Sequence, residues 1–468
     1  MKASERFDAY LDYLSDGLGH ADRDAGLRGY CTGLMLPLTR KSVEPMAAGL
    51  DPLHVRARHQ SLHHFVAKAD WSDAEMLRRI RDWVMPKLGL DTGGFWIVDD
   101  TGFPKKGKHS VGVARQYCGV LGKQDNCQVA VSVSLASASG SLPVSWQLYL
   151  PKAWADDPAR RQKAGVPDAM AFATKPEMAL QHLASLLAEG LPPYCVLADA
   201  GYGVDTAFRN GLTDLGLPYV VGITSAISVW PPEIEPLPPK PWKGKGRPPS
   251  QPRRTADRQS MSVKALAMAL PTERYQTVHW REGTNQTLSN RFAAVRVRHA
   301  GSNIGRTRLW PQQWLLIEWP EHQSEPEKYA LSTLPETATL DELVGIAHQR
   351  WRIERDYQEL KQEFGLGHYE GRGWRGFHHH ASLSIAAYGF LVAERLAGHK
   401  PGAQKNRIRR QTPAVPEDFI PRGTPQSSAA RPQLHPNPAP STQRSARRNA
   451  TQMSVLRTSE PQVTFVTQ

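Results

Sequence analysis

The chain has 468 residues, of which 40% are hydrophobic and 22% are charged, a composition typical of a globular protein with more than one domain. No apolar run approaches the roughly 20 residues of a membrane span, and the N-terminus lacks the apolar core of a signal peptide. We therefore expect a cytoplasmic protein with no membrane partner. The four cysteines form no CxxC pair, which argues against a zinc ribbon or a disulfide framework.

The net charge of +13 is concentrated in two segments that are poor in apolar residues. Lys and Arg outnumber Asp and Glu in residues 231–260 and again in residues 401–468, which are also rich in Pro, Ser and Gln. We expect 401–468 to be a disordered basic tail. Basic charge in such segments favours contact with a polyanion, although a purely solubilising role stays open.

Residues 1–90 read as helical. The clearest helix starts at Ser72, where Ser-Asp-Ala-Glu forms a capping box ahead of apolar residues at helical spacing. Upstream, the segment HVRARHQSLHHFV (54–66) mixes basic and apolar residues. It fits a DNA-facing helix, and it fits a solvated amphipathic helix equally well. We expect 1–90 to be a helical DNA-binding region.

From residue 91 the pattern changes to short apolar or alternating runs typical of strands, with one helix predicted at 176–189. Strands combined with a helix predict an α/β domain with a mixed sheet, beginning with 91–204. Further strands make 205–338 a β-rich insertion with a Pro-rich basic loop at 231–258. Residues 339–400 then supply two helices, predicted at about 339–363 and 380–397, that complete the α/β domain.

Two predicted strands end in an acid followed by loop-forming residues. WIVDD ends at Asp100 and CVLAD ends at Asp199. The carboxyl ends of strands are where α/β folds place ligand groups, and a carboxylate there suits a hard cation such as Mg²⁺. Each acid taken singly also fits a turn or a helix cap.

A third acid lies on the predicted helix HQRWRIERDYQELKQEFG (348–365). At 100° per residue, Glu354 shares a narrow stripe with Arg350 and Lys361. An ordinary helix with a salt bridge between Arg350 and Glu354 explains the same pattern. Together with the two strand acids, however, Glu354 would complete a site for two divalent ions, which activate a water or a 3′-hydroxyl and stabilise the leaving oxygen of a phosphodiester. Arg350 and Lys361 would bind neighbouring DNA phosphates.

Four blocks of this chain resemble the DDE-type transposases of bacterial insertion sequences, in particular the insertion sequence 701 branch of the insertion sequence 4 superfamily. They are FWIVDDTGFPKKGKHSVGVARQY (95–117), VLADAGYG (196–203), HWREGTNQTLSNRFAAVRV (279–297) and RWRIERDYQELKQEFGLGHYEGRGW (350–374). The last block carries the Arg, Glu and Lys of the superfamily's Tyr–Arg–Glu–Lys signature on Arg350, Glu354 and Lys361. The Tyr position falls on Ala347, a departure from the signature.

This resemblance implies an RNase H-like catalytic domain with a β-rich insertion between the second Asp and the Glu. The family's first Asp precedes a Thr, which places it on Asp100, although Asp99 is adjacent; the second is Asp199. The implied activity is cleavage at the terminal inverted repeats and strand transfer, with two Mg²⁺ or Mn²⁺ ions held by Asp100, Asp199 and Glu354. The implied partners are double-stranded DNA, at the transposon ends and the target, and a second copy of the chain.

Additional basic residues are candidates for DNA contacts. Lys105 and Lys106 follow the first acid within one loop, and Arg372 follows the catalytic helix. A solvated loop explains the lysines equally well. Two other functions stay open: a decayed transposase that only binds DNA, and a cellular nuclease on the same scaffold.

Overall fold

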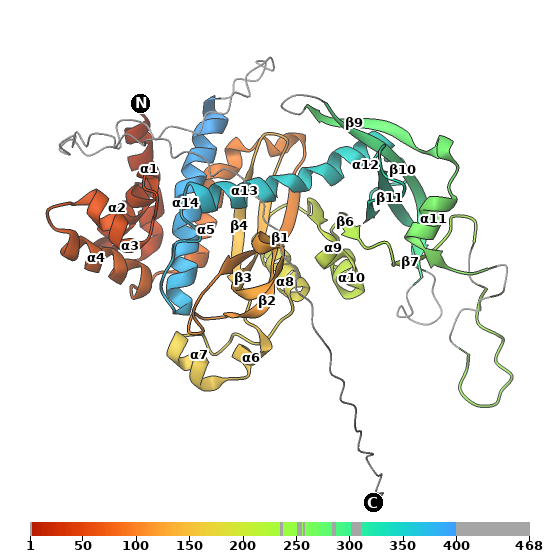
Figure 1. The fold of residues 1–468 in the computed structure, drawn as a ribbon, viewed down its shortest axis with the longest axis horizontal. Helices are drawn as coiled ribbons and strands as arrows, with labels where there is room; N and C mark the ends of the chain where they lie inside the picture. The colour runs from red at the N-terminus through yellow and green to blue at the C-terminus, as the bar shows by residue number, and fades with distance from the viewer. Residues whose placement is uncertain are drawn as a thin grey trace, which may run out of the picture. The chain divides into compact units, whose positions relative to one another are not determined.

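The computed structural model is built around a twelve-stranded mixed sheet (Figure 1). The structure describes residues 2–234, 237–249, 255, 258–282, 287–300 and 310–398. The sheet has the order β2-β3-β1-β5-β6-β12-β11-β10-β7-β8, with β4 paired to β3 and β9 paired to β10. The strands are β1 (Phe95–Pro104), β2 (Ala114–Cys118), β3 (Lys123–Ala136), β4 (Ser141–Leu148), β5 (Cys195–Ala198), β6 (Tyr219–Ile223), β7 (Ser228–Trp230), β8 (Met261–Ser262), β9 (Gln276–Glu282), β10 (Thr287–His299), β11 (Gln313–Trp319) and β12 (Lys328–Ser332).

Five of these strands, in the order β4-β3-β1-β5-β6, form the part of the sheet that carries the expected acids. β1 pairs antiparallel with β3 and parallel with β5, and β5 pairs parallel with β6. The parallel strands β5 and β6 are short apolar runs because both of their faces are covered. The expectation of a mixed sheet in an α/β domain is therefore confirmed.

Helices cover both faces of this part of the sheet. Neighbouring side chains of β4 point to opposite faces: the Trp146 ring contacts Tyr357 of α13, whereas Gln147 contacts His182 of α8. The helices are α1 (Ala3–Ser15), α2 (Asp24–Met35), α3 (Val43–Leu50), α4 (Val55–Ala67), α5 (Asp73–Val84), α6 (Lys152–Ala155), α7 (Pro158–Ala164), α8 (Lys175–Ala188), α9 (Ala200–Gly203), α10 (Thr206–Asp214), α11 (Val263–Ala269), α12 (Leu340–Ala347), α13 (Trp351–Gln362) and α14 (Trp374–Gly398). None of the described helices is both long and apolar enough to span a bilayer.

The helix predicted at 339–363 is interrupted. α12 and α13 are separated by a 3₁₀ turn at His348–Arg350, so Arg350 lies in this turn whereas Glu354 and Lys361 lie on α13. The apolar face of α13 docks on the sheet, where Ile353 and Leu360 are buried in the main core.

Helix α14 links the N-terminal helices to the sheet. It packs against α2, α4, α5 and β4, and most of its residues are buried. Three consecutive histidines bond to different elements: His378 Nε2 faces the backbone N–H of Leu148, His379 stacks on Trp71, and His380 faces the Tyr30 hydroxyl. All three histidines are buried, and together they join α14 to the core.

The strands that follow β6 extend the same sheet instead of forming a separate one. β12 pairs antiparallel with β6, and β11 and β10 follow in order. The expected insertion 205–338 includes β6, which pairs parallel with β5. The described residues all lie within one compact unit, Met1–Pro421, and the division at 90, 204 and 338 stays a prediction. The loop at 231–258 is described only in part, and 401–468 lies outside the described residues.

Candidate active site

Asp99 and Asp199 lie side by side where two parallel strands meet. Val98 of β1 is paired with Ala198 of β5, so the next residue on each strand is one of these acids. Asp199 directly follows the last residue of β5, and its Oδ1 accepts a hydrogen bond from the backbone N–H of Gly201, which caps α9. The turn fits closely against β6, since a Cβ on Gly203 would lie 2.0 Å from the Gly222 carbonyl oxygen.

Asp100 points to the opposite face of β1 from Asp99. Strand β1 continues to Pro104, so Asp100 lies inside the strand and not at its carboxyl end. Its carboxylate accepts a hydrogen bond from Lys175 Nζ at 3.0 Å and another from the Tyr202 hydroxyl at 3.4 Å. The expected role of Asp100 as the first acid therefore does not fit the geometry, which pairs Asp99 with the helix that carries Glu354.

The side of the sheet that Asp99 faces is fixed by its strand partner. Asp99 is opposite Ser132 of β3, and the Ser132 hydroxyl lies 2.8 Å from that of Tyr357 on α13. Asp99 is 15% exposed, and burial raises the pKa of its carboxyl to about 7. The nearby guanidinium of Arg350 lowers this pKa, whereas the negative charge of Asp199 raises it.

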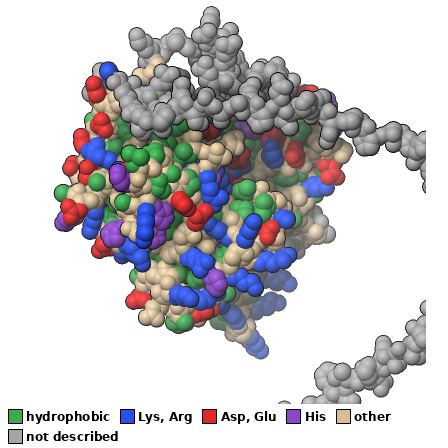
Figure 2. Space-filling view, turned by 60° about the vertical axis from the view of Figure 1, so that its left-hand side comes forward, with side chains coloured by type: hydrophobic (Ala, Val, Ile, Leu, Met, Phe, Trp, Pro, Cys, Tyr) green, Lys and Arg blue, Asp and Glu red, His purple; other side chains and the backbone are tan. Residues whose placement is uncertain are grey.

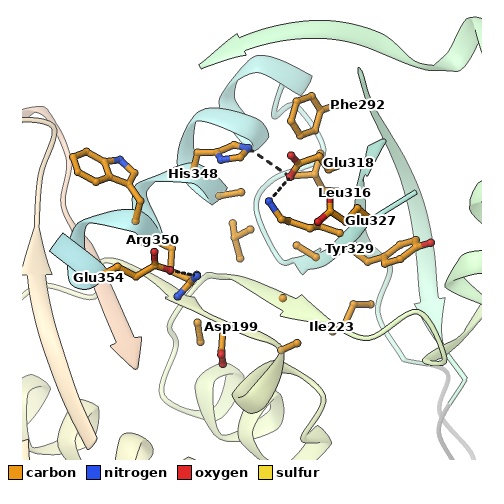
Figure 3. A pocket seen from close by; sticks show the side chains of 18 residues that line it. Asp199, Ile223, Phe292, Leu316, Glu318, Glu327, Tyr329, His348, Arg350 and Glu354 are labelled. Atoms are coloured by element: carbon orange, nitrogen blue, oxygen red, sulfur yellow. Dashed lines mark hydrogen bonds and ion pairs between the residues drawn. The ribbon is translucent and has the colours of Figure 1, made fainter. Parts of the chain in front are cut away.

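Arg350 connects two of the three carboxylates. Its Nη1 lies 3.4 Å from Asp99 Oδ2, and its Nη2 donates to Glu354 Oε1. Glu354 is 57% exposed, and Figure 3 shows it beside Arg350 at the edge of a cavity that Asp199 also lines. In the described part of the chain, no three acidic, histidine or cysteine side chains are close enough to hold a metal ion. The guanidinium thus supplies the positive charge between Asp99 and Glu354 in this arrangement.

Lys361 is held against β1. Its ammonium donates hydrogen bonds to Thr101 Oγ1 at 2.6 Å and to the Gly102 carbonyl at 2.9 Å, and it lies 5.0 Å from the Phe103 ring centroid. Burial lowers the pKa of Lys361 to about 8. The expected phosphate contact therefore does not match the position of this side chain, which fastens α13 to the strand that carries Asp99.

The other basic candidates lie on two adjoining loops, which meet where the Val111 N–H donates to the Arg372 carbonyl. Lys105 is partly buried, and its Nζ donates to the Tyr369 carbonyl at 2.9 Å. Lys106 and Arg372 are exposed. Lys106 and Arg372 are thus placed to reach a ligand. Lys105 instead holds the two loops together.

The cavity beside Asp199 has a volume of about 450 Å³, and it is also lined by Glu318, an acid that sequence reasoning missed (Figure 3). Glu318 of β11 is buried, and its Oε1 accepts a hydrogen bond from Asn290 Nδ2 at 2.6 Å. His348 Nε2 lies 3.8 Å from the other oxygen of this carboxylate, and the His348 ring stacks on Trp280 at 4.1 Å. The only signal in the sequence was a carboxylate inside the apolar run QWLLIEW.

Comparisons with known proteins place the chain in a family. A family model described as DDE superfamily endonuclease matches residues 13–287, more than half of the chain. A protein of Microchaete diplosiphon described as a probable transposase for insertion sequence element IS701 is 34% identical over 196 residues, which cover 41% of this chain and 47% of the relative. The match thus spans about half of that relative's length.

Among solved structures, a cryo-EM structure of the piggyBac transposase synaptic complex with hairpin DNA aligns with a TM-score of 0.41 and 9% sequence identity. That alignment covers 81% of this chain and 66% of the other.

Proposed function

Because the chain belongs to the DDE superfamily endonucleases, we propose that it is the DNA transposase of an insertion sequence. It would cleave DNA at the terminal inverted repeats of its element and join the ends to target DNA. The observation that carries this proposal is the grouping of three carboxylates around Arg350. Asp199, Arg350 and Glu354 line one cavity, and Arg350 also pairs with Asp99, which lies next to Asp199 on the neighbouring parallel strand. The partial match to the IS701 relative supports the same function.

We assign the three site carboxylates to Asp99, Asp199 and Glu354, with Asp99 in place of Asp100. The strand order β4-β3-β1-β5-β6, antiparallel on one side of β1 and parallel on the other, supports an RNase H-like core around them. The donor set suits a hard divalent cation, because all three groups are carboxylates. We propose two Mg²⁺ ions as the natural cofactor, with Mn²⁺ as a substitute.

The reaction would be an in-line attack of water or a 3′-hydroxyl on a phosphodiester. A bound divalent cation supplies Lewis-acid activation of the attacking oxygen and stabilisation of the leaving oxygen. The chain's own residues contribute position and charge: α13 holds Glu354 opposite the strand acids, and Lys361 keeps that helix on β1. Arg350 neutralises the carboxylates and, with Glu354 at the exposed edge, is placed to meet a phosphate.

The proposed DNA contacts differ between two lysines. An exposed lysine that neutralises a phosphate steepens the salt dependence of binding, whereas one with its ammonium bonded inside the protein does not. We therefore expect Lys106→Met to reduce the magnitude of the slope of log K against log salt, where K is the DNA-binding constant, by about one. Lys361→Met should leave this slope unchanged. Titration of a labelled duplex at several salt concentrations measures both slopes, and an equal fall in the two would contradict the placement of Lys361.

The proposed partners are duplex DNA at the transposon ends and at the target, with two copies of the chain pairing the two ends. The symmetry of the substrate favours this assembly, because two identical ends must be processed together. Its test is the mass of the complex with end DNA.

The function is tested with the purified full chain, Mg²⁺ and a labelled duplex that carries the terminal repeat of its element. Wild type should cleave at the repeat boundary, and Glu354→Gln should bind the duplex without cleaving it. Glu363→Gln, at the carboxyl end of the same helix, is the matched control and should cleave like wild type. Binding without cleavage by wild type would indicate a decayed, DNA-binding transposase, and cleavage that ignores the repeat would indicate a nuclease.

A further inference from the structure

Helices α3 and α4 are joined by only four residues and pack against each other and against α2. The apolar face of α4, with Leu62 and Phe65, is buried. This face of α4 packs closely against α2 because α2 has glycines at two contact positions. A Cβ on Gly26 would lie 2.5 Å from the Phe65 ring, and a Cβ on Gly29 would lie 3.3 Å from Leu62. Two helices joined by a short turn and supported by a third form the helix-turn-helix connectivity, in which the second helix enters the DNA major groove.

The opposite face of α4 is exposed and carries side chains suited to base edges. Arg56, Gln60, His63 and His64 follow one another at intervals of one helical turn or less, and all four are exposed. Arg pairs with guanine and Gln with adenine in the major groove, and histidine can donate or accept there. The rings of His59 and His63 lie nearly parallel, with centroids 6.1 Å apart.

The charges on α4 differ from those on its neighbours. Arg28 on α2 is paired with Asp8, Asp12 and Asp24, and Arg78 on α5 is paired with Glu75 and Asp82. Helix α4 contains no acid.

Among the described residues, Arg56, Arg58 and Lys68 form no ion pair with a carboxylate. Figure 2 shows histidine, Lys and Arg side chains interspersed with Asp and Glu on one face of the molecule. Exposed cations that are not already paired with carboxylates are available to neutralise the phosphates of a polyanion.

We propose that α4 reads duplex DNA in the major groove, with Arg56, Gln60 and His63 contacting base edges. This inference rests on the proposed DNA function and adds the element that recognises the end of the transposon. Helix α14 packs against both α4 and the sheet strand β4, so it stands between them in the chain of contacts. The active-site acids and α4 would then act on different parts of one duplex.

The test compares binding of the full chain to a duplex with the terminal repeat and to a scrambled duplex of equal length, in EDTA so that no cleavage occurs. Arg56→Ala and Gln60→Ala should each weaken binding to the repeat by about tenfold and leave binding to the scrambled duplex within about threefold. Arg78→Ala is the matched control, because its guanidinium is neutralised by two acids, and its binding should equal that of wild type. Thermal melting confirms that each variant is folded.

Each outcome separates this inference from the proposed function. If Arg56→Ala and Gln60→Ala bind the repeat as tightly as wild type does, the proposed role of α4 is overturned. An equal loss of affinity for both duplexes would also overturn it, because it would indicate phosphate contacts without base readout. Either result leaves the proposed function intact if cleavage with Mg²⁺ still depends on Glu354. A chain that binds neither duplex would instead overturn the proposed function itself.

Discussion

An Asp99→Asn variant is expected to lose Mg²⁺-dependent cleavage by about 10³-fold, whereas Asp100→Asn should stay within about tenfold of wild type. Metal-assisted stabilisation of a phosphodiester transition state is worth several kcal/mol, and each ~1.4 kcal/mol changes the rate tenfold. Asp99 faces Arg350 and the charge of Asp199, whereas Asp100 is bonded to Lys175 on the other face of β1. Single-turnover cleavage of the end duplex measures both rates.

The two substitutions are a matched pair because each replaces a carboxylate with an amide of the same shape at adjacent positions. Asp99→Asn removes a negative charge near the DNA, so its affinity for the end duplex should equal or exceed that of wild type. Asp100→Asn should cost at most about 1 kcal/mol of stability, since the exposed part of its ion pair with Lys175 is screened by solvent. The reverse ranking, with Asp100→Asn inactive and Asp99→Asn active, would restore the assignment made from the resemblance.

The choice between these two acids shows where sequence reasoning reaches its limit. Asp199 was predictable, because a short apolar strand ends directly before it and a Gly follows at the turn. For Asp99 and Asp100 the alternation of a strand indicates only that they point to opposite faces. Which face meets the catalytic helix depends on the register of β1 with β3 and β5, a long-range property that no local pattern contains.

For helix α13, too, the sequence predicts local contacts and not long-range ones. The spacing of Arg350 and Glu354 predicts their ion pair, and the structure confirms it. The same stripe suggests that Lys361 faces DNA, but its ammonium is bonded to Thr101 and Gly102, 260 and 259 residues earlier in the chain. Glu318 was missed for the same reason, because its partners Asn290 and His348 are distant in sequence. Local periodicity predicts which residues share one face of a helix. It does not predict which residues of other elements contact that face, because those contacts depend on the fold.

A second large effect is expected at Asp356, which fixes α13 from its buried side. This carboxyl is 1% exposed and accepts hydrogen bonds from Ser141 Oγ at 2.7 Å, Tyr388 Oη at 2.7 Å and Ser134 Oγ at 3.3 Å. Asp356→Ala would leave these buried hydroxyls without their acceptor, and we expect a loss of about 3–5 kcal/mol in the free energy of unfolding. Ser384→Ala is the control, because among the described residues the Ser384 hydroxyl has no hydrogen-bond partner.

Asp356→Asn separates the hydrogen bonds from the charge. An amide keeps an acceptor oxygen for Ser141 and Tyr388 and can donate to Ser134, so this variant should retain most of the stability that Asp356→Ala loses. Burial raises the pKa of Asp356 to about 6, above the value of about 3.9 for an unfolded Asp. The folded state therefore binds the proton more tightly, and the contribution of the protonated carboxyl to stability is complete below about pH 4 and lost as the pH rises through 6.

This pH dependence has a definite sign and size. Between pH 5 and pH 8 the wild type should lose about 1–1.5 kcal/mol of unfolding free energy through Asp356, and Asp356→Asn, which cannot ionise, should not. The stability of Asp356→Asn relative to wild type should therefore rise with pH by that amount, as measured by urea unfolding at the two pH values. A constant difference would mean that Asp356 is ionised throughout this range. In that case the hydrogen bonds from the three hydroxyl groups to an ionised Asp356 would hold α13 in place, without a proton on the carboxyl.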